Sequence, residues 1–249
     1  EASWKTVWQY ILSWVTGNSG LRLNHWLSYV SPMYGKHDPL PRNAKEISIQ
    51  KGVEWFYNAH LLIDPVWKNT WLKYQGDGYA PFGPPVNPSL PNGDGSLGIL
   101  EGHASDINYD GTQQYRYWVR ADVQGEAAYA FSAAGSFLHR PEYDTIAAHL
   151  GDFLLHHSNL RSGRKNDMNS PAFGLIGWAV TQPNVFYGDD NARCILGLIG
   201  AEAWMNTGRW NKEIAEAILA NLRTAGKEGF RGNRLLEEDI VKNGWQYYD

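Results

Sequence analysis

Cysteine is almost absent from this sequence. Cys194 is the only cysteine among 249 residues, so the chain cannot form an internal disulfide, and a metal site built from clustered cysteines is excluded. Cys194 stands next to Ile195 and Leu196 in a segment with helical spacing. Because unpaired cysteines in apolar surroundings usually fill a core, we interpret Cys194 as a core residue and not as a reactive thiol.

Charge and long apolar runs are also scarce. Charged residues make up 19% of the chain, the net charge is −4 and no basic stripe is present, which disfavours nucleic acid as a partner. No run of about 18 apolar residues occurs, so we expect no membrane span. The chain begins Glu-Ala-Ser-Trp and ends on aromatic residues. We therefore expect a trimmed product, secreted or periplasmic in a bacterium, whose partners include further segments of the same native chain.

Aromatic residues take the place of the missing charge. They make up 14% of the chain, with 12 Trp and 14 Tyr. Each of these side chains combines a flat apolar face with one hydrogen-bonding group, and a sugar offers the matching C–H patch and hydroxyl rim. Any single Trp is more often a core residue. The number of Trp and Tyr in glycine-rich loops nevertheless favours a sugar ligand for the set as a whole.

Helical spacing of apolar residues dominates the chain. Asp64-Pro65 has the form of an N-cap followed by proline at the first helical position. The pattern predicts an all-α fold, an array of antiparallel αα-hairpins forming a single domain over residues 1–249, without a sequence repeat of fixed period. The predicted helices cover residues 4–15, 43–63, 64–74, 119–138, 143–158, 189–206, 210–225 and 235–242.

The segment 76–111 is the least regular part of the chain, and such long loops are usually functional. We expect at most a short hairpin between 76 and 118. Glu101, His103, Asp106, Tyr109 and Asp110 crowd together at the end of this segment among glycines. A site and a solvated loop of turn-forming residues are both consistent with this pattern.

A second group follows at 116–126. On a helix, Trp118, Asp122, Glu126 and Tyr129 share one face, opposite a face rich in alanine. We interpret this face as the wall of a cleft. The alternative is a polar start of a helix with local ion pairs.

A third group is Tyr187, Asp189, Asp190 and Arg193, at the expected start of a helix. One acid can cap the helix while the other points elsewhere. The alternative is capping together with an ion pair between Asp189 and Arg193. We expect this loop and the two groups before it to converge on one concave site.

These residue types suit the cleavage of a glycosidic bond, which needs one carboxylic acid to protonate the leaving oxygen and a second carboxylate to activate water or attack the anomeric carbon. Aromatic rings would orient the sugar. We expect neither a metal nor a cofactor. The catalytic candidates are Asp122, Glu126, Asp190 and Glu101. The candidates for substrate binding are Trp118, Arg120, Tyr115, His103, Tyr187, Asp189, Arg193 and Trp178.

Several motifs resemble those of bacterial six-hairpin glycosidases. The resemblance spans about residues 95–248 and implies an (α/α)6 toroid with its site at one end of the barrel. Two features differ: the predicted helices are fewer than the twelve of a full toroid, which implies a partial toroid or a fragment, and the cysteine-rich zinc site of one arabinofuranosidase group is absent. The motifs are Gly-Ile-Leu-Glu-Gly at 98–102, Asp-Gly-Thr-Gln at 110–113, Arg-Ala-Asp at 120–122, Ser-Pro-Ala-Phe-Gly-Leu-Ile-Gly-Trp at 170–178 and Gly-Asp-Asp-Asn-Ala-Arg at 188–193.

Two other functions are consistent with the same residues. A polysaccharide lyase would abstract a proton with Tyr or His and neutralise a uronate with Arg, through His103, Tyr109, Tyr115 and Arg120. A non-catalytic glycan-binding protein would use the aromatic residues alone. Geometry separates the three: a carboxylate pair about 5–10 Å apart supports the hydrolase, Tyr and His opposite Arg support the lyase, and a flat aromatic strip supports the binding protein.

Overall fold

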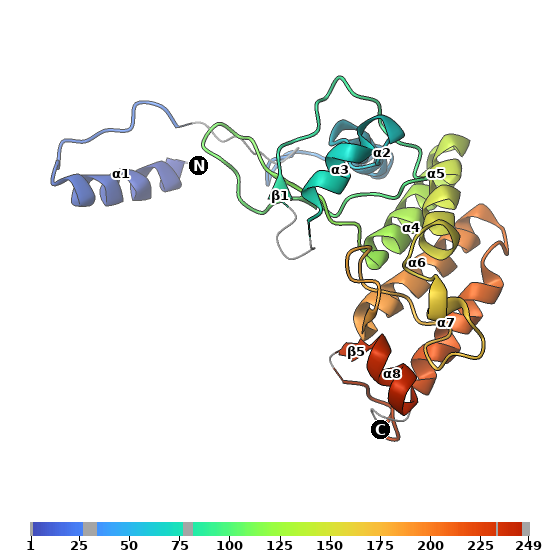
Figure 1. The fold of residues 1–249 in the computed structure, drawn as a ribbon. Coiled ribbons are helices and arrows are strands. Elements are labelled where there is room, and N and C mark those ends of the chain that lie inside the picture. The colour runs from blue at the N-terminus through green and yellow to red at the C-terminus, as the bar shows by residue number, and fades with distance from the viewer. Residues whose placement is uncertain (1, 27–33, 77–81, 233, 246–249) are drawn as a thin grey trace. The chain divides into compact units, whose positions relative to one another are not determined.

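The computed structural model describes residues 2–26, 34–76, 82–232 and 234–245. By contacts between Cα atoms, the chain divides into two compact units, residues 1–42 and 43–249. The described residues contain eight α-helices and only short strands, which confirms the predicted mainly helical fold (Figure 1). None of the helices that the structure describes has the length and apolarity that crossing a membrane requires.

The first unit contains helix α1, Ala2–Thr16, at the position predicted for a helix. The helix gives way to a turn at Gly17, where φ is 68°. The aromatic residues of α1 are largely exposed: Trp4 is 63% accessible and Trp14 is 77% accessible. No described residue of this unit is fully buried.

The second unit begins with helix α2, Ala44–Asn58, which ends five residues before the predicted boundary. The backbone leaves the helix at His60, where φ is 48°. Beyond it the chain is extended along residues 98–100, with the amide of Leu100 donating to Leu61 at 2.9 Å. Pairing with a distant segment therefore overrides the helical pattern of these residues.

The predicted cap at Asp64 is confirmed. Its Oδ1 accepts a hydrogen bond from the amide of Val66 at 2.8 Å. The cap begins a short 3₁₀ helix, Pro65–Trp67, which continues as α3, Lys68–Tyr74. Proline at the first helical position costs no hydrogen bond, because that amide has no intrahelical partner.

A small antiparallel sheet occupies the region where we expected at most a hairpin. It consists of β1, Phe82–Gly83, β2, Gly102–His103, and β3, Tyr115–Arg116, in the order β1-β3-β2. The prediction is wrong by one strand. Strands of two residues are too short to show a periodic pattern in the sequence.

A second sheet was not predicted. Strand β4, Val185–Tyr187, pairs antiparallel with β5, Arg234–Leu236. Each strand leads directly into a helix, α6 and α8 respectively. Neither sheet reaches four strands within the described residues, so the helical interpretation stands.

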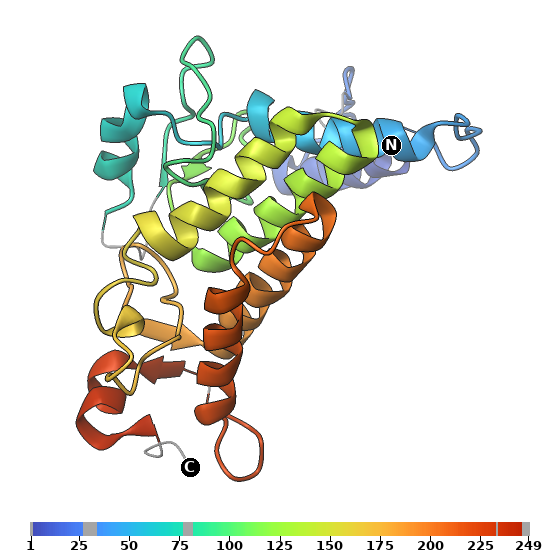
Figure 2. The same ribbon diagram turned by 90° about the vertical axis from the view of Figure 1, so that its right-hand side faces the viewer.

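The long helices form two antiparallel hairpins, which Figure 2 shows side by side. Gly135 near the end of the first helix faces Asp144 near the start of the second. Gln124 near the start of the first helix and Phe153, just beyond the end of the second, both lie beside Gly98. The second pair is antiparallel as well. Asn221 near the end of its second helix donates to Asn191 near the start of its first, and the amide of Trp210 donates to Glu202 at the other end. The helices are α4, Ala121–Leu138, α5, Pro141–Asp152, α6, Gly188–Met205, and α7, Asn211–Arg223.

Two further helical segments flank these hairpins. Helix α5 continues as a five-residue π-helix, Phe153–His157, so the predicted helix 143–158 is confirmed with altered geometry at its end. Helix α8, Glu237–Asn243, follows β5. Between the hairpins, residues 159–184 are irregular apart from the 3₁₀ helix Gly163–Asn166.

Helices α4 and α6 run parallel and touch along glycines. A Cβ atom added to Gly125 would lie 2.8 Å from the Cα of Cys194, and one on Gly197 would lie 2.3 Å from the backbone of Gly125. One turn further on, a Cβ on Gly200 would lie 2.6 Å from the ring of Tyr129. Cys194 is fully buried in this seam, which confirms it as a core residue, and burial raises its thiol pKa well above the ordinary value.

The core of the second unit has two parts. The larger part joins α4, α5 and α6 to the segments around Leu62 and Ile99. The smaller part lies between β4, β5, α7 and α8 and includes Phe186 and Leu235. Polar anchors fix the irregular segment to these helices: Asn191 accepts from the amide of Ile176 at 3.0 Å and donates back to its carbonyl oxygen at 2.8 Å.

Candidate functional site

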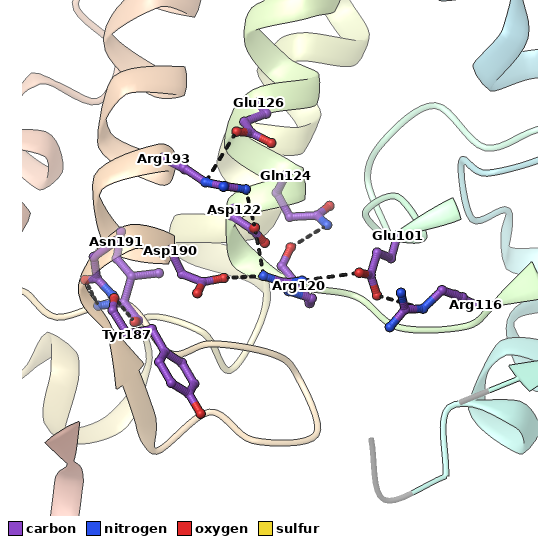
Figure 3. A network of polar contacts seen from close by, with 11 residues as sticks. Glu101, Arg116, Arg120, Asp122, Gln124, Glu126, Tyr187, Asp190, Asn191 and Arg193 are labelled. Atoms are coloured by element: carbon purple, nitrogen blue, oxygen red, sulfur yellow. Dashed lines mark hydrogen bonds and ion pairs between the residues drawn. The ribbon is translucent and has the colours of Figure 1, made fainter. Parts of the chain in front are cut away.

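Arg120 stands where the acidic segments meet (Figure 3). It is the last extended residue before α4, with φ −102° and ψ 150°. Its backbone forms an isolated antiparallel β-bridge with Ala179. Its guanidinium binds three carboxylates from three parts of the chain. Nη2 lies 2.9 Å from Asp122 and 2.7 Å from Asp190, and Nη1 lies 3.2 Å from Glu101. The structure therefore brings together the three segments that the sequence singled out.

Asp122 and Asp190 occupy equivalent places on neighbouring helices. Each lies in the first turn of its helix, α4 or α6, where the helix dipole favours a negative charge. Because one nitrogen of Arg120 binds both, the two carboxylate oxygens are no more than about 5.6 Å apart, the sum of the two distances. The parallel arrangement of α4 and α6 thus places two carboxylates side by side.

Glu101 reaches the same guanidinium from outside the helices. Its amide donates to the carbonyl oxygen of Trp118 at 2.8 Å, which ties the residue before β2 to the residues after β3. Its second oxygen lies 3.4 Å from Nε of Arg116. Glu101 therefore links two arginines of the same extended segment.

Gln124 fixes the backbone beneath this cluster. Its Oε1 accepts from the amide of Ile99 at 2.8 Å, and its Nε2 donates to the carbonyl oxygens of Ile99 at 3.0 Å and Arg120 at 2.9 Å. The side chain is fully buried. Gln124 and Arg116 lie within the group at 116–126, but the sequence does not mark them as candidates, because nothing nearby in the chain reveals their distant partners.

The cluster is buried and rich in negative charge. Asp122 is 2% accessible and Asp190 is 4% accessible. Burial raises the pKa of both carboxyl groups above the ordinary aspartate value, despite the opposing effect of Arg120. Oδ1 of Asp122 is buried and has no hydrogen-bond partner among the described residues. A carboxyl group in this position can hold a proton.

Aromatic rings flank the arginines. Trp178 packs edge-on against Trp118 at 5.1 Å and against Tyr187 at 5.2 Å between ring centroids. The guanidinium of Arg120 lies 5.7 Å from the ring centre of Trp178, and that of Arg116 lies 5.4 Å from Trp118. Backbone hydrogen bonds hold Trp178 in place, since its carbonyl oxygen accepts from Ala121.

Three further candidates lie at the edge of the cluster. Arg193 is half exposed and lies 3.7 Å from Asp122 and 3.9 Å from Glu126, which is itself half exposed. Asp189 is exposed. No ion pair joins Asp189 and Arg193 in the described structure, so the alternative that paired them is wrong, and Arg193 turns toward α4 instead.

The expected helical face from Trp118 to Tyr129 is wrong at its start. Helix α4 begins at Ala121, so Trp118 lies in the extended segment before it. The ring of Trp118 packs on Arg116 and Trp178. The rise in the pKa of Asp122 comes from overall burial, and its nearest charged partner is Arg120.

His103 and Tyr115 lie apart from the cluster and line a pocket together with Trp55. Their rings lie 4.6 Å apart, and the hydroxyl of Tyr115 donates to the carbonyl oxygen of Ala59. Tyr109 lies in the loop between β2 and β3 and is 94% accessible. The residues expected of a lyase are therefore spread over separate places, and only Arg120 belongs to the carboxylate cluster.

The described residues contain no group of three His, Cys, Asp or Glu side chains placed to hold a metal ion. Comparison with family models, with curated proteins and with solved structures finds no match to the chain. The geometry of the site is therefore the basis for any functional conclusion.

Proposed function

We propose that the protein is a glycoside hydrolase whose catalytic carboxylates are Asp122 and Asp190. The single observation that carries the proposal is that these two aspartates, on parallel helices, meet at one nitrogen of Arg120. A separation of about 5–5.5 Å between carboxyl groups is typical of retaining glycosidases, in which one carboxylate attacks the anomeric carbon. The shared contact with Arg120 limits the distance between the two nearest oxygens to about 5.6 Å, which is compatible with that separation.

In this proposal Asp122 donates the proton to the leaving oxygen. It is the more buried of the two, and its Oδ1 has no partner among the described residues. A carboxyl group whose pKa is raised by burial suits a proton donor near neutral pH. Asp190 would then act as the nucleophile. Arg120 would fix the positions of the two carboxylates relative to each other and would not itself react.

The surrounding residues fit a sugar substrate. Trp178 and Tyr187 provide apolar ring surface beside the carboxylates, and both are partly accessible. Arg193, at the edge of the cluster, provides donors for sugar hydroxyls, while Glu101 orients Arg116 and Arg120. The proposed substrate is an oligosaccharide or polysaccharide.

We further propose that the two hairpins are consecutive units of an (α/α)6 toroid. In such a fold the inner helices run parallel to each other and each returns through an outer helix. Two features support this proposal: α4 and α6 run parallel in close contact, and each packs against the helix that follows it. Helices α4 and α6 would take the inner positions. The carboxylates would then lie at one end of the barrel.

The test is a screen of aryl glycosides and of plant and host polysaccharides for release of reducing sugar. Wild type, Asp122→Asn and Asp190→Asn are compared on any substrate that is cleaved. Each substitution should lower turnover by at least about 10²-fold, because it removes a proton donor or a nucleophile without changing its shape. Glu46→Gln is the matched control, since Glu46 is an exposed acid in the first turn of α2.

Near-normal turnover of both aspartate variants on a cleaved substrate would refute the assignment. Binding of a glycan without cleavage by wild type would support the non-catalytic alternative. Product with an unsaturated uronate end would support a lyase instead.

A further inference from the structure

A pocket lies on the small sheet, apart from the carboxylate cluster. On β3, Arg116 contacts Glu101 of the cluster, while its neighbour Tyr115 contacts His103 and faces the pocket. Gly102, between Glu101 and His103, has φ 138°, a value that residues with a side chain rarely adopt. The pocket has a volume of about 300 Å³, and the residues on which its chemistry depends are Trp55, Asn58, His103, Thr112, Gln113 and Tyr115.

The pocket has an aromatic wall. Trp55 is 44% accessible, and its ring packs edge-on against His103 at 5.6 Å between centroids. His103 in turn packs on Tyr115, which is buried. Part of the Trp55 ring therefore remains open to a ligand while its neighbours hold it in place.

A hydrogen-bonded turn forms another part of the lining. Oδ1 of Asp110 accepts from the amide of Thr112 at 3.0 Å and from its hydroxyl at 2.8 Å. The amide of Gln113 is anchored as well, because its Nε2 donates to the carbonyl oxygen of Ala104 at 2.9 Å. A wall that is already ordered costs a ligand less conformational entropy on binding.

The described lining carries no charge. None of the described residues that line the pocket is Asp, Glu, Lys or Arg. Burial lowers the pKa of His103, so its ring is neutral at pH 7. Nε2 of His103 is buried without a hydrogen-bond partner in the described structure, and native proteins leave few such atoms unpaired. A small ligand with hydroxyl groups would supply the missing bond.

We propose that this pocket binds one residue of a neutral oligosaccharide, with the sugar ring against Trp55 and its hydroxyls on His103, Asn58 and Gln113. The volume is at the lower end for small-molecule sites, which suits a single sugar ring. The lack of charge excludes a preference for uronates or phosphates. Binding here does not depend on cleavage at Asp122 and Asp190, so the two proposals can fail separately.

The test is calorimetric titration with neutral cello-, xylo- and manno-hexaose and with an oligogalacturonide. Asp190→Asn is the background for all titrations, so that hydrolysis does not consume the probe. Trp55→Ala in that background should bind the preferred neutral probe about tenfold more weakly or worse, the loss typical of truncating an aromatic anchor. Trp204→Ala is the matched control, because Trp204 on α6 is also 44% accessible and should leave affinity unchanged.

A second variant tests whether a loss of binding comes from the site and not from a loss of folded protein. His103→Phe keeps a ring between Trp55 and Tyr115 but removes both nitrogens, and it should weaken binding severalfold while the melting temperature is retained. The proposal is overturned if no neutral probe binds, if Trp55→Ala and Trp204→Ala weaken binding equally, or if the oligogalacturonide binds best. Cleavage of a substrate by wild type is measured separately and bears only on the carboxylate pair.

Discussion

Replacing Arg120 with methionine would leave buried carboxylates without their shared cation. Met keeps much of the side-chain length and removes the charge. The side chains of Asp122 and Asp190 are 3% and 5% accessible, so water cannot replace the guanidinium. Breaking a buried ion pair by removing one partner costs about 3–5 kcal/mol, mostly from the charge left behind. We expect Arg120→Met to lower the free energy of unfolding by that amount at pH 7.

Arg193→Met is the matched control. Arg193 also contacts Asp122, but at 3.7 Å, and its side chain is 53% accessible. Exposed ion pairs of this kind contribute about 0–1 kcal/mol. Urea unfolding followed by circular dichroism gives both values, and an unchanged slope with denaturant shows that the folded and unfolded states remain comparable.

The pH dependence adds an independent check. Without Arg120, the pKa of Asp122 and Asp190 in the folded state should rise further. Between the ordinary aspartate value and this raised value, the folded state binds more protons than the unfolded state, so stability increases as the pH falls. The loss caused by Arg120→Met should therefore be smaller at pH 5 than at pH 7. A loss no larger than that of Arg193→Met, or one independent of pH, would refute this reasoning.

Two further predictions concern the helices and the site. Gly197→Ala should lower the free energy of unfolding by about 1–3 kcal/mol, because its Cβ would lie 2.3 Å from the backbone of Gly125. Gly52→Ala, with open space around it in α2, should raise the free energy of unfolding by about 0.5–1 kcal/mol. Thermal melts that rank the two variants in the opposite order would contradict this packing. Burial raises the pKa of Asp190, so its contribution to stability falls as the pH rises above the ordinary value of 3.8. Asp190→Asn should therefore give a flatter curve of melting temperature against pH just above that value, and an unchanged curve would exclude Asp190 as the titrating group.

The helices could be predicted because their apolar spacing is local. Helix α6, Gly188–Met205, begins and ends within one residue of the prediction. The end of α2 could not be predicted, because residues 61–63 are set by hydrogen bonds to residues 98–100, far along the chain. The sheets were missed or underestimated for the same reason: two- or three-residue strands exist only through their partners.

The sequence identifies the segments that carry the acidic residues of the cluster, but it does not reveal which residues these acids contact. Asp122, Asp190 and Glu101 do meet at Arg120. Asp122 and Asp190 lie in the first turns of α4 and α6, and Glu101 directly precedes β2. The sequence predicts that Arg120 binds substrate or takes part in a local ion pair, and the pair with Asp122 is local, whereas Glu101 and Asp190 come from distant segments. The sequence predicts His103 at the same site, whereas the structure places it on β2 in the pocket that Trp55 and Tyr115 line. Side-chain direction across a sheet depends on register, which a single sequence does not reveal.

The glycine seam between α4 and α6 also determines which part of the site can move. Backbone in contact with backbone cannot slide without a clash, so Asp122 and Asp190 would shift together as one rigid body. Glu101 belongs to a separate segment and is attached to that body through Arg120 and the strand before it. A ligand that reached the two aspartates would therefore meet them at a fixed spacing.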